Sequence, residues 1–425
     1  MTRQEGTRAA ASVSLVVVLA ATLLTLGAGL ALKAPCAAGS WGDGRQYRHL
    51  CYSDIVPLYG TEHLQGGRLP YLNHCPTDAG QQCDEYPVLT MWYMRLAAWL
   101  GHGYGAFFAV NVVGLALAAL VTSWCLYRMV GARALYFALA PTLLIYGFMN
   151  WDLLAVALAA GGTLAFARKR DGLSGVLLGL GAAAKFFPAL LVIPFALSRL
   201  RDGERGKAGT LAASAAGTYV LVNLPFALVA PHQWATFFRF NAARPVDWDS
   251  LWFISCQRIH SAVAGCGWSA DLINTLSVML FVVVAVALWI ARSVRQPDFP
   301  AWTFAFPLLV AFLLVNKVYS PQYGLWLLPW FALALPNPTL FVLFELADVA
   351  VFVTRFTWFG RLAADGGDPT FAGYHGAPLG AFELAVAIRA LVLIACLVAW
   401  VLGEREKHAV AGAVPDGPAL LGVGT

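Results

Sequence analysis

Charge is the scarcest property of this chain. Only 12% of its residues are charged and 59% are hydrophobic, with a mean hydropathy of +0.67, whereas charged residues make up about a quarter of a typical soluble domain. This shortage excludes an ordinary soluble enzyme and predicts a polytopic membrane protein of the all-α class. The net charge of +5 lies in short basic clusters between apolar runs, where it serves membrane topology, so we expect no nucleic-acid partner.

Basic clusters alternate with apolar runs and trace a path by the positive-inside rule. The first run, residues 11–33, is longer than the about 7–15 residues of a signal-peptide core, so we interpret it as an uncleaved span. Residues 173–199 carry basic clusters at both ends, which predicts two half-spans that meet at Lys185. Residues 86–101 mix aromatics with one arginine, which favours an interfacial helix.

This path gives about twelve spans with both chain ends inside. We expect one membrane domain over residues 1–407 and a disordered cytosolic tail over residues 408–425. The predicted external loops are residues 34–103, 231–268 and 359–378. No internal repeat is visible, and the two halves lack matched broken helices, which argues against an inverted-repeat transporter.

Cysteine is also scarce, and none of the eight lies in a predicted cytosolic loop. Those in predicted external loops are Cys36, Cys51, Cys75, Cys83, Cys256 and Cys266. An oxidising exterior would allow them to form disulfides, and Cys256–Cys266 has no rival in its loop. The four cysteines of the first loop permit three pairings, of which Cys36–Cys51 with Cys75–Cys83 is the local choice. Their spacing is poor for zinc, so we predict no metal site.

The polar loop of residues 34–89 is the most conspicuous feature, because it gathers carboxylates, aromatics and cysteines outside the lipid. Within it, apolar residues from Tyr52 onward recur at i, i+3, i+4 and i+7, which predicts a short helix. Ser53 or Asp54 could cap that helix. Alternatively, Asp54 is a general base at the membrane surface, where it takes a proton from an attacking hydroxyl.

Other polar residues of the predicted outer side have both a structural and a functional interpretation. A turn set by glycine and proline accounts for the surroundings of Arg68 and Tyr71. Helix capping or a turn accounts for Glu85, Asn150 and Asp152. In the functional interpretation these residues bind substrate together with Tyr52 and Asp54.

Several cations also need an explanation. Lys185 lies at membrane depth with no acidic neighbour in sequence, which marks either a functional site or a snorkelling side chain. Arg239 and Arg244 could hold a lipid phosphate or contact ordinary anionic headgroups. Lys317 lies in a tight polar connection that could bind a phosphate and a sugar or be a solvated turn. The neighbours assigned with these cations are Ser250, Trp252, Tyr319 and Gln322.

Two charges in the last apolar runs have matching depths. At 1.5 Å per residue, Asp348 lies about 13 Å from the inner end of its run, and Arg389 lies about 15 Å from the outer end of the next run. In a hydrocarbon core about 30 Å thick, these depths predict an Asp348–Arg389 ion pair.

In chain order, the polar motifs are Tyr52-Ser53-Asp54, Gly67-Arg68-Leu69-Pro70-Tyr71, Glu85-Tyr86-Pro87, Asn150-Trp151-Asp152, Lys185-Phe186-Phe187-Pro188, Arg244 followed by Asp249-Ser250-Leu251-Trp252, and Lys317-Val318-Tyr319-Ser320-Pro321-Gln322-Tyr323. In this order and external placement, the chain resembles glycosyltransferase family 87 over residues 40–335. It departs from many such families at Val88, where a second proline is common, and in the cysteine-rich insertion of residues 73–84.

The resemblance implies the C-type glycosyltransferase fold and a polyprenyl-phosphate-mannose-dependent α-mannosyltransferase. It implies that Asp54 is the catalytic base of an inverting transfer, with a lipid-phosphate sugar as co-substrate, no cofactor and no obligatory metal. Expected partners are that donor, a lipid or glycolipid acceptor and membrane lipids, at the external face of the plasma membrane. Cations such as Lys185, Arg239, Arg244 and Lys317 would stabilise the leaving phosphate.

Three other functions fit part of the pattern. A polyprenyl-phosphate arabinofuranosyltransferase would use a donor with the same lipid phosphate. A transporter or flippase of lipid-linked sugars would place polar residues at the bilayer midplane, whereas most of them here lie at the predicted outer face. A non-catalytic envelope scaffold would not need external loops that converge on one cavity.

Overall fold

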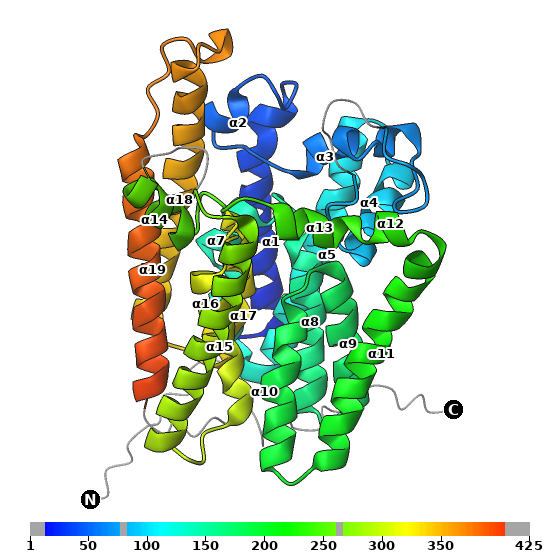
Figure 1. Cartoon of the computed structure of the whole chain (residues 1–425), viewed down its shortest axis with the longest axis vertical. Helices are drawn as coiled ribbons and strands as arrows, with labels where there is room; N and C mark the ends of the chain where they lie inside the picture. Colours follow the sequence, from blue (N-terminus) through cyan, green and yellow to red (C-terminus); the bar gives the residue numbers. More distant parts are fainter. Residues whose placement is uncertain (1–12, 77–82, 261–266, 404–425) are drawn as a thin grey trace, which may run out of the picture.

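A computed structural model describes residues 13–76, 83–260 and 267–403. These residues form α-helices and short 3-10 helices with no strand, so the predicted all-α class is confirmed. The long helices run side by side as a bundle (Figure 1). The predicted tail, residues 408–425, lies outside the described residues.

Six long helices form the frame of the bundle: α1 (Leu15–Ala37), α5 (Tyr104–Val130), α11 (Arg205–Val229), α15 (Ala270–Arg295), α18 (Pro338–Asp365) and α19 (Leu379–Leu402). Within the described residues, five segments are long and apolar enough to cross a membrane, namely α1, α5 with its continuation to Ala138, α11, α15 and α19. Side chains at Ser14, Ser269 and Asn337 accept hydrogen bonds from first-turn amides and so fix the starts of α1, α15 and α18.

Shorter apolar helices fill the space between them: α8 (Asp152–Ala167), α9 (Asp171–Ala184), α10 (Pro188–Arg201) and α16 (Ala305–Val315). Helices α9 and α10 have 14 residues each, or about 21 Å at the α-helical rise, which is too short to cross a bilayer alone. They meet at Lys185, which confirms the predicted pair of short helices.

The predicted count of about twelve spans is not confirmed. Two predicted spans are broken into short pieces, namely α6 (Leu135–Ala138) with α7 (Pro141–Tyr146), and η4 (Pro321–Trp326) with α17 (Leu328–Leu333). Pro141 and Pro321 stand at the first positions of α7 and η4, where a missing N–H is tolerated but a continuous helix is not. These pieces are largely buried in protein, so their hydropathy matches that of a span.

Short helices gather at one end of the bundle, opposite the turn between α10 and α11 (Figure 1). They are α2 (Arg45–Arg48), α3 (Ile55–Thr61), η1 (Leu64–Gly66), α4 (Val88–Leu100), α12 (Pro231–Trp234), α13 (Thr236–Ala243), α14 (Leu251–His260) and η5 (Pro369–Phe371). The remaining 3-10 turns are η2 (Gly131–Ala134) and η3 (Ala301–Phe304). Helix α4 matches the helix predicted over residues 86–101.

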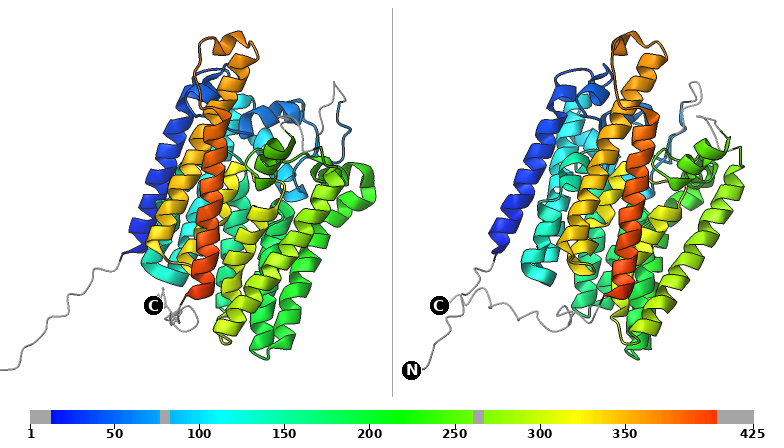
Figure 2. Two further views of the ribbon diagram at one scale, coloured as in Figure 1. Left: turned by 60° about the vertical axis from the view of Figure 1, so that its left-hand side comes forward. Right: turned by 90° about the vertical axis from the view of Figure 1, so that its left-hand side faces the viewer.

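Helices α18 and α19 pack side by side, as Figure 2 shows. The Arg389 Nη1 atom lies 3.1 Å from Asp348 Oδ1, and both side chains are buried. The predicted ion pair is therefore confirmed. Arg389 also donates to the backbone carbonyl of Asp249 at 3.2 Å, which ties the segment before α14 to the bundle.

Two disulfides brace the loop of residues 34–103, which the sequence predicts to be external. Cys36 at the end of α1 is bonded to Cys51, and Cys75 is bonded to Cys83. These are the two local pairs that spacing suggested. The predicted disulfide partner of Cys256 is Cys266, which lies outside the described residues.

Candidate active site

A cavity of about 640 Å³ opens where the short helices meet the bundle. Its wall is built from α3, from the residues between α9 and α10, from α13 and η4, and from the ends of α15, α16 and α18 that face the short helices. The acidic residues of the lining are Asp54 and Glu85, and the basic ones are Lys185, Arg244, Lys317 and Arg355. Residues far apart in the sequence are thus brought together around one polar space.

Asp54 is held by two donors in this wall. The Tyr52 hydroxyl donates to Oδ1 at 2.7 Å, and Asn150 Nδ2 donates to Oδ2 at 2.8 Å. Asp54 stands just before α3 but its side chain accepts no capping hydrogen bond; of the two capping candidates, Ser53 accepts from the Ile55 amide at 3.3 Å. The negative charge of Asp54, together with burial, raises the pKa of Tyr52 well above its usual value. The carboxylate is oriented and keeps lone pairs for a ligand hydroxyl.

The turn that carries Asp54 docks on the segment after α7. The Asp54 amide donates to the Met149 carbonyl at 2.8 Å, and the Ser53 hydroxyl donates to the Phe148 carbonyl at 2.9 Å. Lys33, fully buried near the end of α1, donates to the Tyr52 carbonyl at 2.6 Å. These bonds fix the direction of the Asp54 side chain, and sequence reasoning did not single out Lys33.

Glu85 and Tyr86 form the next part of the wall. Asn150 Nδ2 also donates to the Tyr86 hydroxyl at 2.6 Å, so one amide links Tyr86 with Asp54. Burial raises the pKa of Glu85, with a further rise from the charge of Asp54 and an opposing effect of Arg244. Asn150 therefore acts through Asp54 and Tyr86 and is absent from the lining itself.

Lys185 projects into the cavity at the junction of α9 and α10. Its Nζ atom lies 3.3 Å from Asp152 Oδ2, and it lies over the rings of Tyr86 and Tyr323 at 5.2 and 5.1 Å. Trp326 Nε1 donates to the other oxygen of Asp152 at 2.7 Å. The acidic partner that the local sequence did not show is therefore Asp152, which positions the lysine from outside the lining.

Arg244 and Lys317 form a second cationic group in the lining. Lys317 Nζ donates to the carbonyls of Ala242 and Arg244 at 2.9 and 2.7 Å. Arg244 Nη2 lies 3.6 Å from Asp247 Oδ2. Burial lowers the pKa of Lys317, and the charge of Arg244 lowers it further. An anion bound between these two cations would be stabilised.

Sequence reasoning missed Arg355, which reaches the cavity from α18. Its guanidinium forms ion pairs with Asp249 and with Asp247, the latter at 3.5 Å, and it lies over Phe359 at 5.1 Å. Its buried Nε atom has no hydrogen-bond partner among the described residues. An arginine within an apolar helix was the available signal, because ionisable residues at membrane depth are functional candidates.

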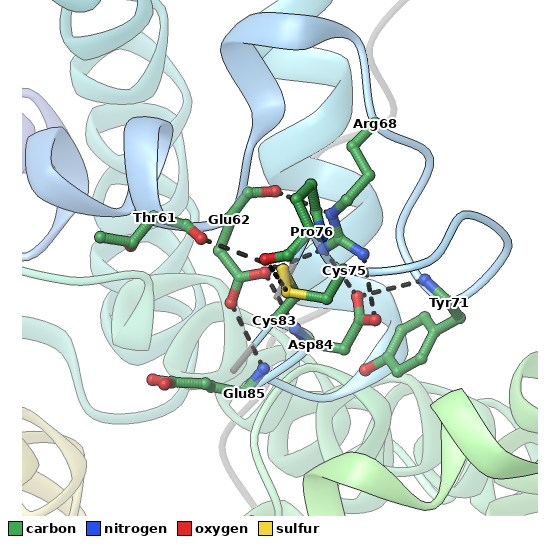
Figure 3. The surroundings of a disulfide bond; sticks show 9 residues. All are labelled: Thr61, Glu62, Arg68, Tyr71, Cys75, Pro76, Cys83, Asp84 and Glu85. Carbon is green, nitrogen blue, oxygen red and sulfur yellow. Dashed lines mark hydrogen bonds and ion pairs between the residues drawn. A yellow bond between two sulfur atoms is a disulfide. The ribbon is translucent and has the colours of Figure 1, made fainter. Parts of the chain in front are cut away.

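Arg68 and Tyr71 are not in the cavity lining and lie near the Cys75–Cys83 disulfide, with Glu62 and Asp84 beside Arg68 (Figure 3). Arg68 is buried between Glu62 and Asp84, with Nη2 at 2.9 Å from an oxygen of each. The Tyr71 amide donates to Asp84 Oδ1 at 3.1 Å. The structure therefore places Arg68 and Tyr71 away from the cavity, where the guanidinium binds Glu62 and Asp84. Glu62 also accepts from the amide of Glu85 at 3.3 Å, so the cluster supports the cavity wall indirectly.

Four further predicted ligands also lie outside the lining. Arg239 is exposed and donates to the His232 carbonyl at 2.6 Å, while Ser250 donates to the Asp247 carbonyl at 2.7 Å. Trp252 donates to the Val315 carbonyl at 2.8 Å, and the Tyr319 ring is covered by Arg389 at 3.8 Å. These contacts hold the loops of the site, and the structure does not bring these four side chains into the cavity lining. Gln322 lines the cavity, and its predicted role in substrate binding stays a prediction.

Three side chains of types that commonly bind metal ions lie close together outside the cavity: His63, Cys75 and Cys83. Because Cys75 and Cys83 form a disulfide, they offer no thiolate, and His63 alone would remain as a strong ligand. This group does not fit a structural metal site.

An oriented carboxylate and several cations around one polar cavity are the groups that a membrane-bound transferase of an anionic substrate would need. The sequence profile of glycosyltransferase family 87 matches residues 85–316, more than half of the chain. The chain belongs to this family and is a membrane glycosyltransferase. No curated protein matches it.

Among solved structures, the chain is similar to the crystal structure of ArnT from Cupriavidus metallidurans bound to undecaprenyl phosphate. The sequences are 14% identical and the TM-score is 0.44, and the similarity covers 91% of this chain and 76% of that chain.

Proposed function

We propose that this glycosyltransferase moves a sugar, with mannose as the first candidate, from a polyprenyl-phosphate donor to a lipid or glycolipid acceptor at the external membrane face. Asp54 is the general base and the product is inverted at the anomeric carbon. The observation that carries the proposal is the carboxylate of Asp54, held by Tyr52 and Asn150 in a cavity wall that also presents Lys185, Arg244, Lys317 and Arg355.

The reaction is a single displacement. The acceptor hydroxyl gives its proton to the Asp54 carboxylate while its oxygen bonds to the anomeric carbon. The bond from that carbon to the phosphate oxygen breaks, and polyprenyl phosphate leaves with the electron pair. The two hydrogen bonds to Asp54 come from neutral donors, one to each carboxylate oxygen, and leave lone pairs on both oxygens for the acceptor hydroxyl.

The leaving phosphate needs positive charge rather than a proton. Arg244 and Lys317 are adjacent, and among the described residues the carboxylate of Asp247, 3.6 Å from Arg244, is the only one within ion-pair distance of either cation. They are therefore the best candidates for the phosphate, with Lys185 held near by Asp152. Side chains supply the charge in this scheme, so we expect transfer to persist in EDTA.

The test is sugar transfer from polyprenyl-phosphate donors by purified wild type and Asp54→Asn. We expect the variant to lose about 10²- to 10⁴-fold in kcat, the usual contribution of a general base. Asp43→Asn is the matched control, because Asp43 lies in the same loop but outside the cavity lining. Undiminished transfer by Asp54→Asn would remove Asp54 from the mechanism. To identify the sugar, transfer is measured with two donors that carry mannose or arabinofuranose on the same lipid phosphate.

A further inference from the structure

Four carboxamide side chains share part of the cavity wall: Asn241, Asn274, Asn316 and Gln322. They come from α13, α15, the residue after α16, and η4. The mechanism above uses none of them. An amide wall of this kind is neutral, so it cannot serve the leaving phosphate by charge.

Three of these amides have a fixed orientation. Asn241 Nδ2 donates to the Phe237 carbonyl at 2.8 Å, Asn274 Nδ2 to the Ala242 carbonyl at 2.9 Å, and Asn316 Nδ2 to the Val318 carbonyl at 3.0 Å. Only the NH₂ end of an amide can donate to a carbonyl, so the positions of nitrogen and oxygen are not interchangeable here. No described residue donates a hydrogen bond to the Oδ1 atom of any of these three asparagines.

Gln322 is the fourth amide and differs from the others. Its residue is 5% exposed, it lines the cavity, and its side chain has no hydrogen bond with any described residue. Its amide atoms are not among the buried polar atoms without a partner, so they are open to water or to a ligand in the cavity. It offers both donors and an acceptor to whatever occupies this part of the cavity.

The ligand that fits this wall donates several hydrogen bonds and has an apolar face. The amide oxygens are acceptors, which suits hydroxyl donors and disfavours the oxygens of a phosphate. The rings of Phe240, Phe312 and Tyr323 line the same cavity, and Tyr323 stacks on Trp326 with 3.9 Å between centroids. Hydroxyls on a ring with C–H faces are the chemistry of a sugar.

Resting on the proposed function, we propose that Asn241, Asn274, Asn316 and Gln322 form a subsite for the hydroxyls of a sugar ring. The subsite adjoins Lys317, one of the cations proposed to bind the donor phosphate. Lys317 Nζ and Asn274 Nδ2 donate to the same carbonyl, that of Ala242. The ring is either the sugar of the donor or a sugar of a glycolipid acceptor. Both present the same hydroxyls, and kinetics separates the two sources.

Gln322→Met is the sharpest variant, because it keeps the side-chain length and breaks no hydrogen bond within the described protein. Asn274→Leu is the second variant. Thr275→Val is the matched control, since Thr275 follows Asn274 on α15, is exposed, and bonds only to the Asp271 carbonyl of its own helix. Loss of one hydrogen bond to a hydroxyl should raise KM about 5- to 10-fold with little change in kcat.

A rise in KM for the donor assigns the ring to the transferred sugar, and a rise for the acceptor assigns it to a glycolipid. Either result supports the subsite. Unchanged KM for both substrates in Gln322→Met and Asn274→Leu, or an equal change in Thr275→Val, overturns it.

A binding measurement keeps this inference separate from the proposed reaction. Methyl glycosides of mannose, glucose, galactose and arabinofuranose are titrated against the purified full chain, with tryptophan fluorescence as the readout because Trp326 lines the cavity. We expect saturable binding of at least one glycoside, weakened at least about 5-fold by Gln322→Met and unchanged by Thr275→Val. Binding without transfer would reject the reaction but keep the subsite, whereas no saturable binding by wild type would overturn the subsite.

Discussion

At the scale of single residues, the site depends on charges that are held in place by buried partners. Lys185 is fixed by Asp152, and Trp326 occupies the second oxygen of that carboxylate. Removing one member of a buried pair leaves the other uncompensated, which is usually worse than removing both. A comparison of the single and double variants can therefore separate the contribution of Lys185 to folding from its contribution to the reaction.

We therefore expect Lys185→Met to reduce both the yield of folded protein and the transfer rate. The double variant Lys185→Met with Asp152→Asn should recover the folded yield, because no unpaired buried charge remains. Its transfer rate should stay at least about 10-fold below wild type, since the cation in the cavity is still missing. Size-exclusion profiles and kcat measurements check the two effects. A fully active double variant would show that Lys185 serves only to neutralise Asp152.

At the scale of elements, the Glu62–Arg68–Asp84 cluster ties α3 to the segment that delivers Glu85 (Figure 3). Two carboxylates share one buried guanidinium, so the cluster carries an excess negative charge. Burial raises the pKa of Glu62 from 4.5 to about 7, with the charge of Asp84 adding to the rise and Arg68 opposing it. The folded state therefore binds a proton more tightly than the unfolded chain.

The sign of the pH effect follows from this raised pKa. The stabilisation from protonated Glu62 is complete below pH 4.5 and is lost as the pH rises through about 7. Melting temperatures of the purified protein should thus fall between pH 5 and pH 8, and Glu62→Gln should flatten that fall. Asp43→Asn serves as the control, because Asp43 is a carboxylate of the same loop that is outside the cluster. An unchanged slope in Glu62→Gln would exclude Glu62 as its source.

The disulfide between Cys36 and Cys51 acts on a different element, the turn of Tyr52 to Asp54. It closes a sequence separation of 15 residues, for which chain entropy predicts about 3 kcal/mol of stabilisation. The double variant Cys36→Ser with Cys51→Ser should lower the melting temperature and the transfer rate together. Replacing Cys75 and Cys83 by serine is the comparison, and it should affect the rate less, because that bridge lies farther along the chain from Asp54. Equal losses of rate would contradict a specific role at the turn.

Elements and contacts differed in how far the sequence predicted them. Long apolar helices and the Asp348–Arg389 pair were predictable, because length, hydropathy and depth fix them. The breaks around α7 and η4 were not, since buried broken segments have the hydropathy of spans. Arg68 was misassigned because its partners Glu62 and Asp84 lie 6 and 16 residues away in sequence and meet it only through folding. The order of the motifs predicted which segments meet at the cavity. It did not distinguish side chains that line the cavity from side chains that hold those segments in place.

At the scale of the whole molecule, the position of the cavity near one end of the bundle defines which membrane face carries the reaction. The disulfides lie at that end, whereas the turn between α10 and α11 at the other end is flanked by Arg199, Arg201, Arg205 and Lys207. Disulfides persist in an oxidising compartment, and basic clusters stay in the cytoplasm. Both rules predict the same orientation, in which the cavity faces outside.

Single cysteines test this orientation on intact cells with a membrane-impermeant maleimide. Ala372→Cys, in the exposed connection between α18 and α19, should be labelled, whereas Asp202→Cys, in the turn between α10 and α11, should react only after the membrane is permeabilised. Wild type gives the background, because the free cysteines Cys125 and Cys396 are buried. The reverse labelling pattern would place the cavity on the cytoplasmic side. The donor would then have to present its sugar to that face, and the external reaction proposed for Asp54 would be ruled out.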